Sequence, residues 1–392
     1  MKKNEIYRIY GTEYEKMTEA LLESSDLASL IEDKIASEGI KESKHLLIGI
    51  KPNLVCPVPA SFGATTHTEV VEGIINYLKK HGYDNLLIIE GSWVGDKTSE
   101  AFEYCGYNSL SDRTGVPLFD TQKDTSHEVR CGDGSLLNIC DKVSDLDFLI
   151  NVPVLKGHAQ VKVTCALKNM KGLIPNSEKR RFHREGLHGP IAHLTLGIPQ
   201  DFIVVDHICG DYDFEEGGNP VTTNCIMTGL DPVLIDTYTC REIGWKVSQV
   251  PYIGMAEKLG LGSTDLDSAK IIDINMAGNI IDSEDRRIDD SDASKDLIHK
   301  IIDVEYAVDE SDSCSACYGN LAPALIRLQE EGLLERLDTT IAIGQGHEGK
   351  TGKLGVGKCC RAYEACIMGC PPDEEKIYRE IKEYILCMLT EK

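Results

Sequence analysis

Cysteines near the C-terminus constrain the fold of this 392-residue chain more than any other feature. They occur in short motifs, which contain Cys314 and Cys317, Cys359 and Cys360, and Cys370. A C-x-x-C pair supplies two thiolate ligands from one turn, and later loops supply a third and a fourth. An iron–sulfur cluster or a structural zinc needs such a set of soft sulfur ligands in a compact cage. The chain must therefore bring separated loops together.

The spacing of these cysteines favours a cluster over zinc. Structural zinc sites usually combine two close cysteine pairs. Here the second half of the set is split between Cys359 and Cys370, as expected for a larger cubane whose ligands come from several loops. We predict one 4Fe-4S cluster as the cofactor. Zinc and plain buried thiols are the alternatives.

The order strand, C-x-x-C, helix, strand, Gly-x-Cys and Gly-Cys-Pro-Pro, over roughly residues 300–375, resembles a known motif. It is similar to the proximal-cluster motif of the small subunit of nickel–iron hydrogenases and of its relative in respiratory complex I. The resemblance implies a small flavodoxin-like α/β module. It implies that the metal ligands are Cys314, Cys317, Cys359 and Cys370. Cys360 and Cys366 remain open as replacements for Cys359.

Charge and hydropathy exclude several classes of partner. The formal net charge of −23 disfavours nucleic acids and anionic membranes, which would be repelled. The sequence shows no apolar run of about 18 residues, the length needed to span a bilayer. It shows no secretory signal at its N-terminus, so we expect a cytoplasmic protein whose fifteen cysteines are reduced rather than disulfide-bonded. The oligomeric state stays open, with a homo-oligomer as one option.

Strands and helices alternate through the longer upstream part. An apolar strand over 45–50, a helix from Glu69 capped by Thr68, and a strand over 85–90 are typical of a parallel α/β unit. The predicted fold class is therefore α/β, with a Rossmann-like parallel-sheet domain followed by the small module. We also expect further strands over 147–154 and 202–206, a helix over 13–38 and an irregular loop over 172–189.

The composition changes once along the chain. Acidic residues are strongly enriched over 282–312, which is the expected boundary between two domains. The first domain then covers residues 1–281 and the C-terminal iron–sulfur module covers 282–392.

Several separated motifs of the first domain occur in an order that resembles one family. They are Lys51-Pro52-Asn53-Leu54, His67-Thr68, Asn151-Val152-Pro153-Val154-Leu155-Lys156-Gly157-His158 and Leu167-Lys168-Asn169-Met170-Lys171-Gly172. Over roughly residues 45–245 the chain looks like the family called domain of unknown function 362. Many members carry a C-terminal iron–sulfur module, usually of ferredoxin type. The resemblance implies a link to anaerobic redox metabolism and fixes no reaction.

The polar residues of these motifs follow strand ends, where ligands bind in open parallel sheets. We predict that they line a basic crevice for a carboxylate, a phosphate or another anion. The alternative is that the lysines cap helix ends and the histidines make loop hydrogen bonds. The predicted binding residues are Lys51, Asn53, His67, Lys156, His158, Lys168, Asn169, Lys171 and His183.

The predicted function is redox or electron transfer, with a redox partner protein or a small anionic molecule bound in the crevice. Whether the protein is an oxidoreductase enzyme stays open. The alternative is a structural cluster or zinc in a non-redox protein that binds an anionic metabolite. A phosphate-loop pattern over 344–351 lacks a good helix after it, and solvated carboxylates are the favoured interpretation of the acidic loop 206–213.

Overall fold

The computed structural model describes residues 1–39, 46–281, 301–311, 313 and 315–390. It divides into two compact units, a larger one of Met1–Phe182 and Leu187–Lys295 and a smaller one of His183–Gly186 and Asp296–Lys392. Both are α/β structures, which confirms the predicted fold class. Most of the acidic stretch 282–312 lies outside the described residues, so the domain boundary stays a prediction.

An eight-stranded sheet forms the centre of the larger unit, in the order β12-β1-β11-β10-β7-β2-β3-β4. Pairing is parallel from β10 through β7, β2 and β3 to β4, whereas β11 runs antiparallel to both β10 and β1. The strands are β1 Glu5–Tyr10, β2 Ile48–Pro52, β3 Leu86–Glu90, β4 Leu118–Asp120, β7 Phe148–Val152, β10 Phe202–Asp211, β11 Pro220–Gly229 and β12 Lys270–Ile274.

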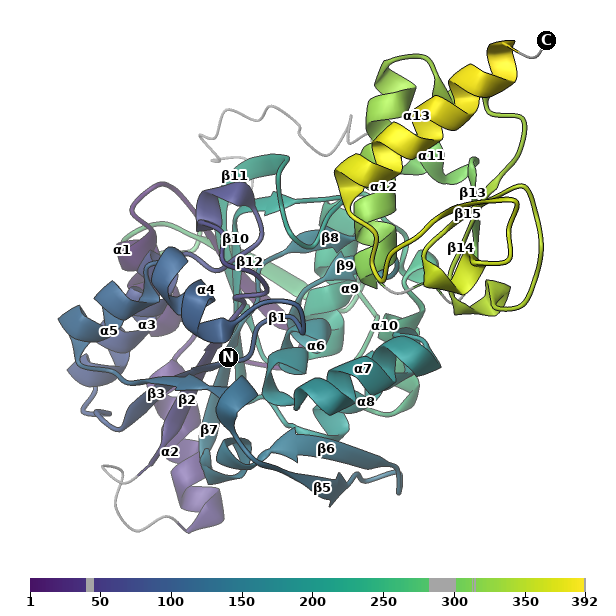
Figure 1. Ribbon diagram of the computed structural model, residues 1–392. Helices are drawn as coiled ribbons and strands as arrows, with labels where there is room; N and C mark the ends of the chain where they lie inside the picture. The colour runs from purple at the N-terminus through teal and green to yellow at the C-terminus, as the bar shows by residue number, and fades with distance from the viewer. Residues whose placement is uncertain (40–45, 282–300, 312, 314, 391–392) are drawn as a thin grey trace. The chain divides into compact units, whose positions relative to one another are not determined.

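Helices cover both faces of this sheet (Figure 1). The helices on one side supply apolar residues to a core shared with the strands; they are α1 Tyr14–Ser24, α2 Leu27–Glu38, α3 Thr68–Lys80, α4 Thr98–Tyr104 and α5 Tyr107–Thr114. The apolar spacing of α3 shows why, because Val70, Val71, Ile74, Ile75 and Leu78 form one buried stripe. The later helices of this unit are α6 Ala166–Asn169, α7 Asn176–Glu185, α8 His188–Gly197, α9 Pro232–Glu242 and α10 Pro251–Lys258.

Two short hairpins complete the larger unit. One consists of β5 Ser126–Arg130 and β6 Leu136–Cys140, and the other of β8 Lys156–His158 and β9 Lys162–Thr164. The second hairpin carries two of the predicted anion-binding residues.

Two local predictions were wrong, and one strand was missed. The expected helix over 13–38 is interrupted at Asp26, whose left-handed backbone (φ 57°) separates α1 from α2. The expected loop over 172–189 contains α7. Strand β1 was missed because two of its six residues, Glu5 and Arg8, are charged yet buried, and Arg8 is ion-paired with Asp273.

The smaller unit is built on a four-stranded, all-parallel sheet in the order β13-β14-β15-β16. The two long helices of this unit pack against each other, and their buried leucines and isoleucines include Leu321, Leu325, Ile377 and Ile381. The elements are α11 Ile302–Glu305, β13 Val308–Glu310, α12 Ser315–Glu330, β14 Ile341–Ile343, β15 Leu354–Val356, β16 Ala365–Ile367 and α13 Glu374–Thr390.

Candidate functional site

The carboxyl ends of three adjacent parallel strands gather the first group of polar residues. Strand β2 lies between β7 and β3, so Asn151 near the end of β7, Lys51 near the end of β2 and Glu90 at the end of β3 come together. This edge is the usual ligand-binding edge of an open α/β sheet. The predicted Lys51 thus lies at this edge together with Glu90 and Asn151, which were not among the predicted residues, and ligand binding there stays a prediction.

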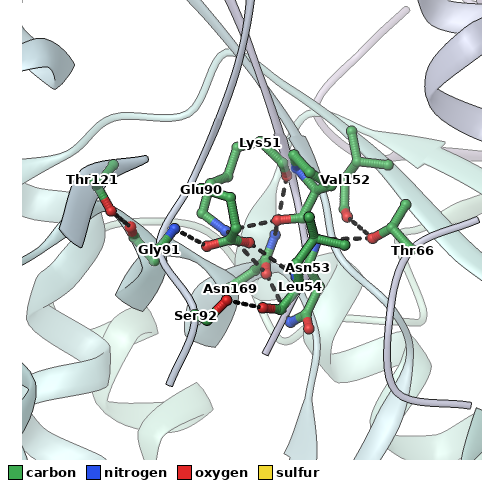
Figure 2. A network of polar contacts seen from close by, with 12 residues as sticks. Lys51, Asn53, Leu54, Thr66, Glu90, Gly91, Ser92, Thr121, Val152 and Asn169 are labelled. Atoms are coloured by element: carbon green, nitrogen blue, oxygen red, sulfur yellow. Dashed lines mark hydrogen bonds and ion pairs between the residues drawn. The ribbon is translucent and has the colours of Figure 1, made fainter. Parts of the chain in front are cut away.

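A buried ion pair joins β2 to β3. The ammonium of Lys51 lies 2.6 Å from Glu90 Oε2 and donates a second hydrogen bond to the Pro52 carbonyl at 2.7 Å. Glu90 also accepts from the backbone amides of Leu54 at 3.1 Å and Gly91 at 2.6 Å (Figure 2). Burial lowers the pKa of Lys51, and the attraction of Glu90 opposes that change.

Asn169, in α6, links the neighbouring backbones. Its Oδ1 accepts from Asn53 Nδ2 at 2.9 Å, and its Nδ2 donates to Asn151 Oδ1 at 2.7 Å and to the Lys51 carbonyl at 3.2 Å. Thr66 closes the network from another loop, since its hydroxyl donates to the Val152 carbonyl at 2.9 Å. Side chains from four separated segments are thus fixed in one arrangement.

Lys156, in β8, is the second buried lysine. Its ammonium donates to the Ala64 carbonyl at 2.5 Å, the Glu215 carbonyl at 2.8 Å and Asn53 Oδ1 at 3.1 Å. Burial lowers the pKa of Lys156 to about 8, while Glu215 acts in the opposite direction. Asn53 therefore joins the Lys156 side of the site to the Asn169 side.

Glu215, which the sequence analysis missed, lies beside Lys168, the third lysine of the site. Glu215 is ion-paired through Oε1 with Lys168 and has its Oε2 3.0 Å from His158 Nε2. The His158 Nδ1 accepts from the amides of Gln160 at 3.0 Å and Val161 at 3.3 Å. Burial lowers the pKa of His158 to about 4, so the ring is neutral at pH 7 with its proton on Nε2.

Glu215 is strongly acidic in this setting. Burial alone would raise its pKa, but Lys168, His158 and Lys156 together hold the pKa well below its usual range. The carboxylate is therefore ionised at neutral pH.

His67 belongs to a separate pair. Its Nδ1 lies 2.8 Å from Asp206 Oδ2, which also accepts from the His67 amide at 2.7 Å. Burial acts to lower the pKa of His67, but Asp206 outweighs it and raises the pKa to about 10. Residue Cys209 lies on the other side of the ring, with Sγ 4.0 Å from Nε2. Asp206 is fully buried, so this carboxylate is not the solvated loop acid favoured from the sequence.

Lys171 and His183 are the remaining predicted residues. Burial and the proximity of Lys168 lower the pKa of Lys171 to about 7. His183 belongs to the stretch His183–Gly186, which groups with the smaller unit. Lys179 was missed, although its ammonium donates to the carbonyls of Gly91 and Ser92 at 2.9 Å each and its pKa falls to about 8 through burial.

Nothing in the local sequence marks Glu215 as part of the site. It lies in a Glu-Glu-Gly-Gly segment between β10 and β11. Glu90, in contrast, ends a predicted strand, so the strand-end rule applied to acids as well as bases would have found it. Of the predicted residues, His67, Lys171 and His183 are half-buried and the others are buried, and their binding of an anion stays a prediction.

Gly172 lies directly against the Lys51–Glu90 ion pair, where a larger residue would not fit without a shift. A Cβ at this position would lie 1.9 Å from Glu90 Oε1 and 2.6 Å from Lys51 Nζ. We therefore expect Gly172→Ala to lower the free energy of unfolding by about 1–3 kcal/mol, as overpacking does. Gly189→Ala is the matched control, because its new Cβ would meet nothing within 4 Å.

Urea unfolding followed by tryptophan fluorescence checks this expectation. Both tryptophans, Trp93 and Trp245, lie in the larger unit with the two glycines, so the signal reports on the correct unit. Equal urea midpoints for Gly172→Ala and Gly189→Ala would show that the chain relieves the close contact at position 172 without losing stability.

Cysteine-bearing segments of the smaller unit meet after the strands of the parallel sheet. Cys317 lies in the first turn of α12, Cys359 follows β15, and Cys370 follows β16. The Sγ of Cys317 lies 3.8 Å from the place of a Cβ on Gly357, and Lys358 N donates to the Gly369 carbonyl at 2.8 Å. Cys314, the fourth predicted ligand, lies outside the described residues.

The structure distinguishes the two adjacent cysteines. Cys360 is fully buried and its Sγ donates to the Ala342 carbonyl at 3.3 Å, whereas Cys359 is half-buried. Cys366 is also half-buried, with Sγ 3.5 Å from the Gly357 carbonyl. Cys360 therefore packs as an apolar residue, which favours Cys359 as the third ligand.

Across the described part of the chain, no three His, Cys, Asp or Glu side chains already stand close enough together to hold a metal ion. The phosphate-loop pattern is followed by β15 rather than by a helix at Lys350, so the structural context of that motif is missing. Among the described residues, none of the helices has both the length and the apolar character required to cross a membrane.

Comparisons with known proteins agree with the upstream motifs. The model of the family described as domain of unknown function (DUF362) matches residues 48–241. The thylakoid-associated protein sll1697 of Synechocystis sp. is 24% identical in an alignment of 240 positions, which covers 55% of this chain and 68% of the relative.

Two solved structures are also similar. The lactate racemase apoprotein from Thermoanaerobacterium thermosaccharolyticum has 14% identity and a TM-score of 0.41, with 62% of this chain and 57% of that chain covered. A protein from Thermotoga maritima has 11% identity and a TM-score of 0.29, with 64% and 60% covered. The chain thus spans less than two thirds of either solved protein.

The family match covers the strand-end motifs around Lys51, Lys156 and Lys168 and the acidic loop that contains Glu215. Residues 48–241, just under half of the chain, are therefore similar to the family described as domain of unknown function (DUF362).

Proposed function

We propose that this protein is a cytoplasmic iron–sulfur protein, with one 4Fe-4S cluster in its smaller unit, that transfers single electrons in anaerobic metabolism. Its electron partner is a redox protein or a small anionic molecule, and the DUF362 domain binds the anion. The alternative, a structural cluster or zinc in a non-redox protein, is an outcome of the test below.

The convergence of the cysteine segments carries the first part of the proposal. Three segments far apart in sequence place Cys317, Cys359 and Cys370 after strands of one parallel sheet, and the hydrogen bond from Lys358 to Gly369 joins two of these segments. Cys314 would complete the set through its C-x-x-C spacing. A cluster bound there supplies reversible one-electron chemistry, with a potential set by nearby amides and solvent access.

A surplus of lysines, four of them buried and one half-buried, supports the second part of the proposal, which is the binding of an anion. Five lysines, Lys51, Lys156, Lys168, Lys171 and Lys179, lie around the strand ends with the carboxylates Glu90 and Glu215. Burial lowers the pKa of Lys156, Lys171 and Lys179 to about 8, 7 and 8. An added anion would stabilise their charged forms, which makes anion binding favourable there.

Purification without oxygen, followed by metal analysis, tests the proposal. We expect about four iron ions per chain and a broad visible absorption. Electron paramagnetic resonance after dithionite reduction should show a signal that disappears on reoxidation. Stoichiometric zinc without iron would reject the cluster, and a cluster that cannot be reduced without loss of fold would reject electron transfer.

A further inference from the structure

Glu215 separates the basic centre of the DUF362 domain from solvent. The side chains of Lys168 and His158 are each 2% exposed, whereas that of Glu215 is 22% exposed. Its two carboxylate oxygens are divided between them, with Oε1 on Lys168 and Oε2 3.0 Å from His158 Nε2. The carboxylate thus occupies a position that opens to solvent on one side and to buried basic groups on the other.

The backbone around Glu215 is held independently of this carboxylate. Its carbonyl accepts from Lys156 Nζ at 2.8 Å. Asp211 accepts from the amides of Asp213, Phe214 and Asn219 at 2.8–3.0 Å and so fixes both ends of the loop. The loop backbone therefore has hydrogen bonds of its own that do not depend on the Glu215 carboxylate.

The two groups that Glu215 contacts would suit any carboxylate. Lys168 supplies a positive charge to one oxygen, and the buried Nε2 of His158, whose Nδ1 accepts two backbone amides, lies 3.0 Å from the other without the geometry of a hydrogen bond. A free carboxylate has the same pair of oxygens and the same charge. A ligand with this group competes directly with the side chain.

We propose that Lys168 and His158 form a carboxylate-binding subsite, which Glu215 fills in the absence of ligand and from which a small organic carboxylate displaces it. This inference deepens the anion-binding part of the proposed function and rests on it. Glu215 then acts as an internal competitor, which lowers the apparent affinity by the fraction of time that the subsite is open.

Titration of the full-length Glu215→Ala variant with sodium acetate tests the proposal. The substitution removes a CH2–COO− group, the size of one acetate ion. If the subsite of the unmodified protein is open about a tenth of the time, calorimetry should show acetate binding about tenfold tighter to the variant. Sodium chloride at equal ionic strength controls for screening.

Further variants separate this role from general effects. Glu216→Ala changes the exposed neighbour in the same loop and should leave acetate affinity unchanged. Glu215→Gln keeps the side-chain shape and removes only the competing charge, so it should give a smaller gain even if the alanine variant folds poorly. Adding Lys168→Met to Glu215→Ala should abolish the gain.

The outcomes are distinguishable. Acetate affinity that is measurable and equal in the unmodified protein and the Glu215 variants would overturn internal competition while leaving the anion site intact. No binding of acetate or inorganic phosphate by any variant would overturn both. An equal gain for inorganic phosphate would overturn the assignment to carboxylates, and iron content reports separately on the cluster.

Discussion

Replacing Cys370 by serine should remove most of the iron from protein purified without oxygen. Serine has no thiolate, so a cubane that depends on four cysteine ligands would lose one of them. The effect should appear as a drop from about four iron ions per chain and as loss of the visible absorption, with tryptophan fluorescence of the larger unit unchanged.

The matched control is Cys387→Ser. Both cysteines are exposed, but Cys387 lies on α13, away in sequence from the three convergent segments. This variant should keep its iron. Full iron in the Cys370 variant would show that the ligand assignment is wrong.

A second pair of variants tests the choice between adjacent thiols. Cys359→Ser should lose iron, whereas Cys360→Ser should keep it, because the Cys360 Sγ is buried and hydrogen-bonded to the Ala342 carbonyl. The reverse result would exchange their roles.

Replacing Lys51 by methionine should destabilise the larger unit by about 3–5 kcal/mol, the usual cost of removing one partner of a buried ion pair. Methionine is apolar and removes the ammonium from the Glu90 carboxylate, which keeps the amides of Leu54 and Gly91, in a site where the two side chains are 1% and 3% exposed. Urea unfolding followed by tryptophan fluorescence gives the change, since Trp93 and Trp245 both lie in this unit.

A double-mutant cycle separates the ion pair from simple loss of packing. Glu90→Gln in the Lys51→Met background removes the unpaired charge, so the double variant should be less destabilised than the sum of the two single variants. Lys16→Met removes the exposed partner of Glu13 and should leave the urea midpoint unchanged. Additive losses from Lys51 and Glu90 would show that their charges do not interact strongly.

Local patterns predicted much of the fold. Apolar runs identified strands close to β2, β3 and β7, and the helical spacing of 69–78 identified α3. The prediction failed where local chemistry and tertiary context disagree. The left-handed Asp26 breaks a continuous helical pattern, and β1 carries charges that only a buried partner such as Asp273 makes acceptable.

The residues of the candidate site also divide into those that local motifs predicted and those that they missed. Motifs placed Lys51, Asn53, Lys156, Lys168 and Asn169 at one edge because each follows or ends a local element. Their acidic partners were missed, since Glu90 lies 39 residues from Lys51 and Glu215 lies 47 residues from Lys168. The strand-end rule could have singled out Glu90, but no local rule pairs groups that are so far apart in the sequence.

The sequence alone determined the α/β class and the similarity of residues 48–241 to the DUF362 family, because hydrophobic periodicity and ordered short motifs are properties of neighbouring residues. The tertiary structure alone decided which charges meet. Strand order sets β2 beside β3, and the turn between β10 and β11 carries Glu215 to Lys168. A buried ammonium needs an acceptor, and only the folded chain determines which one lies within reach.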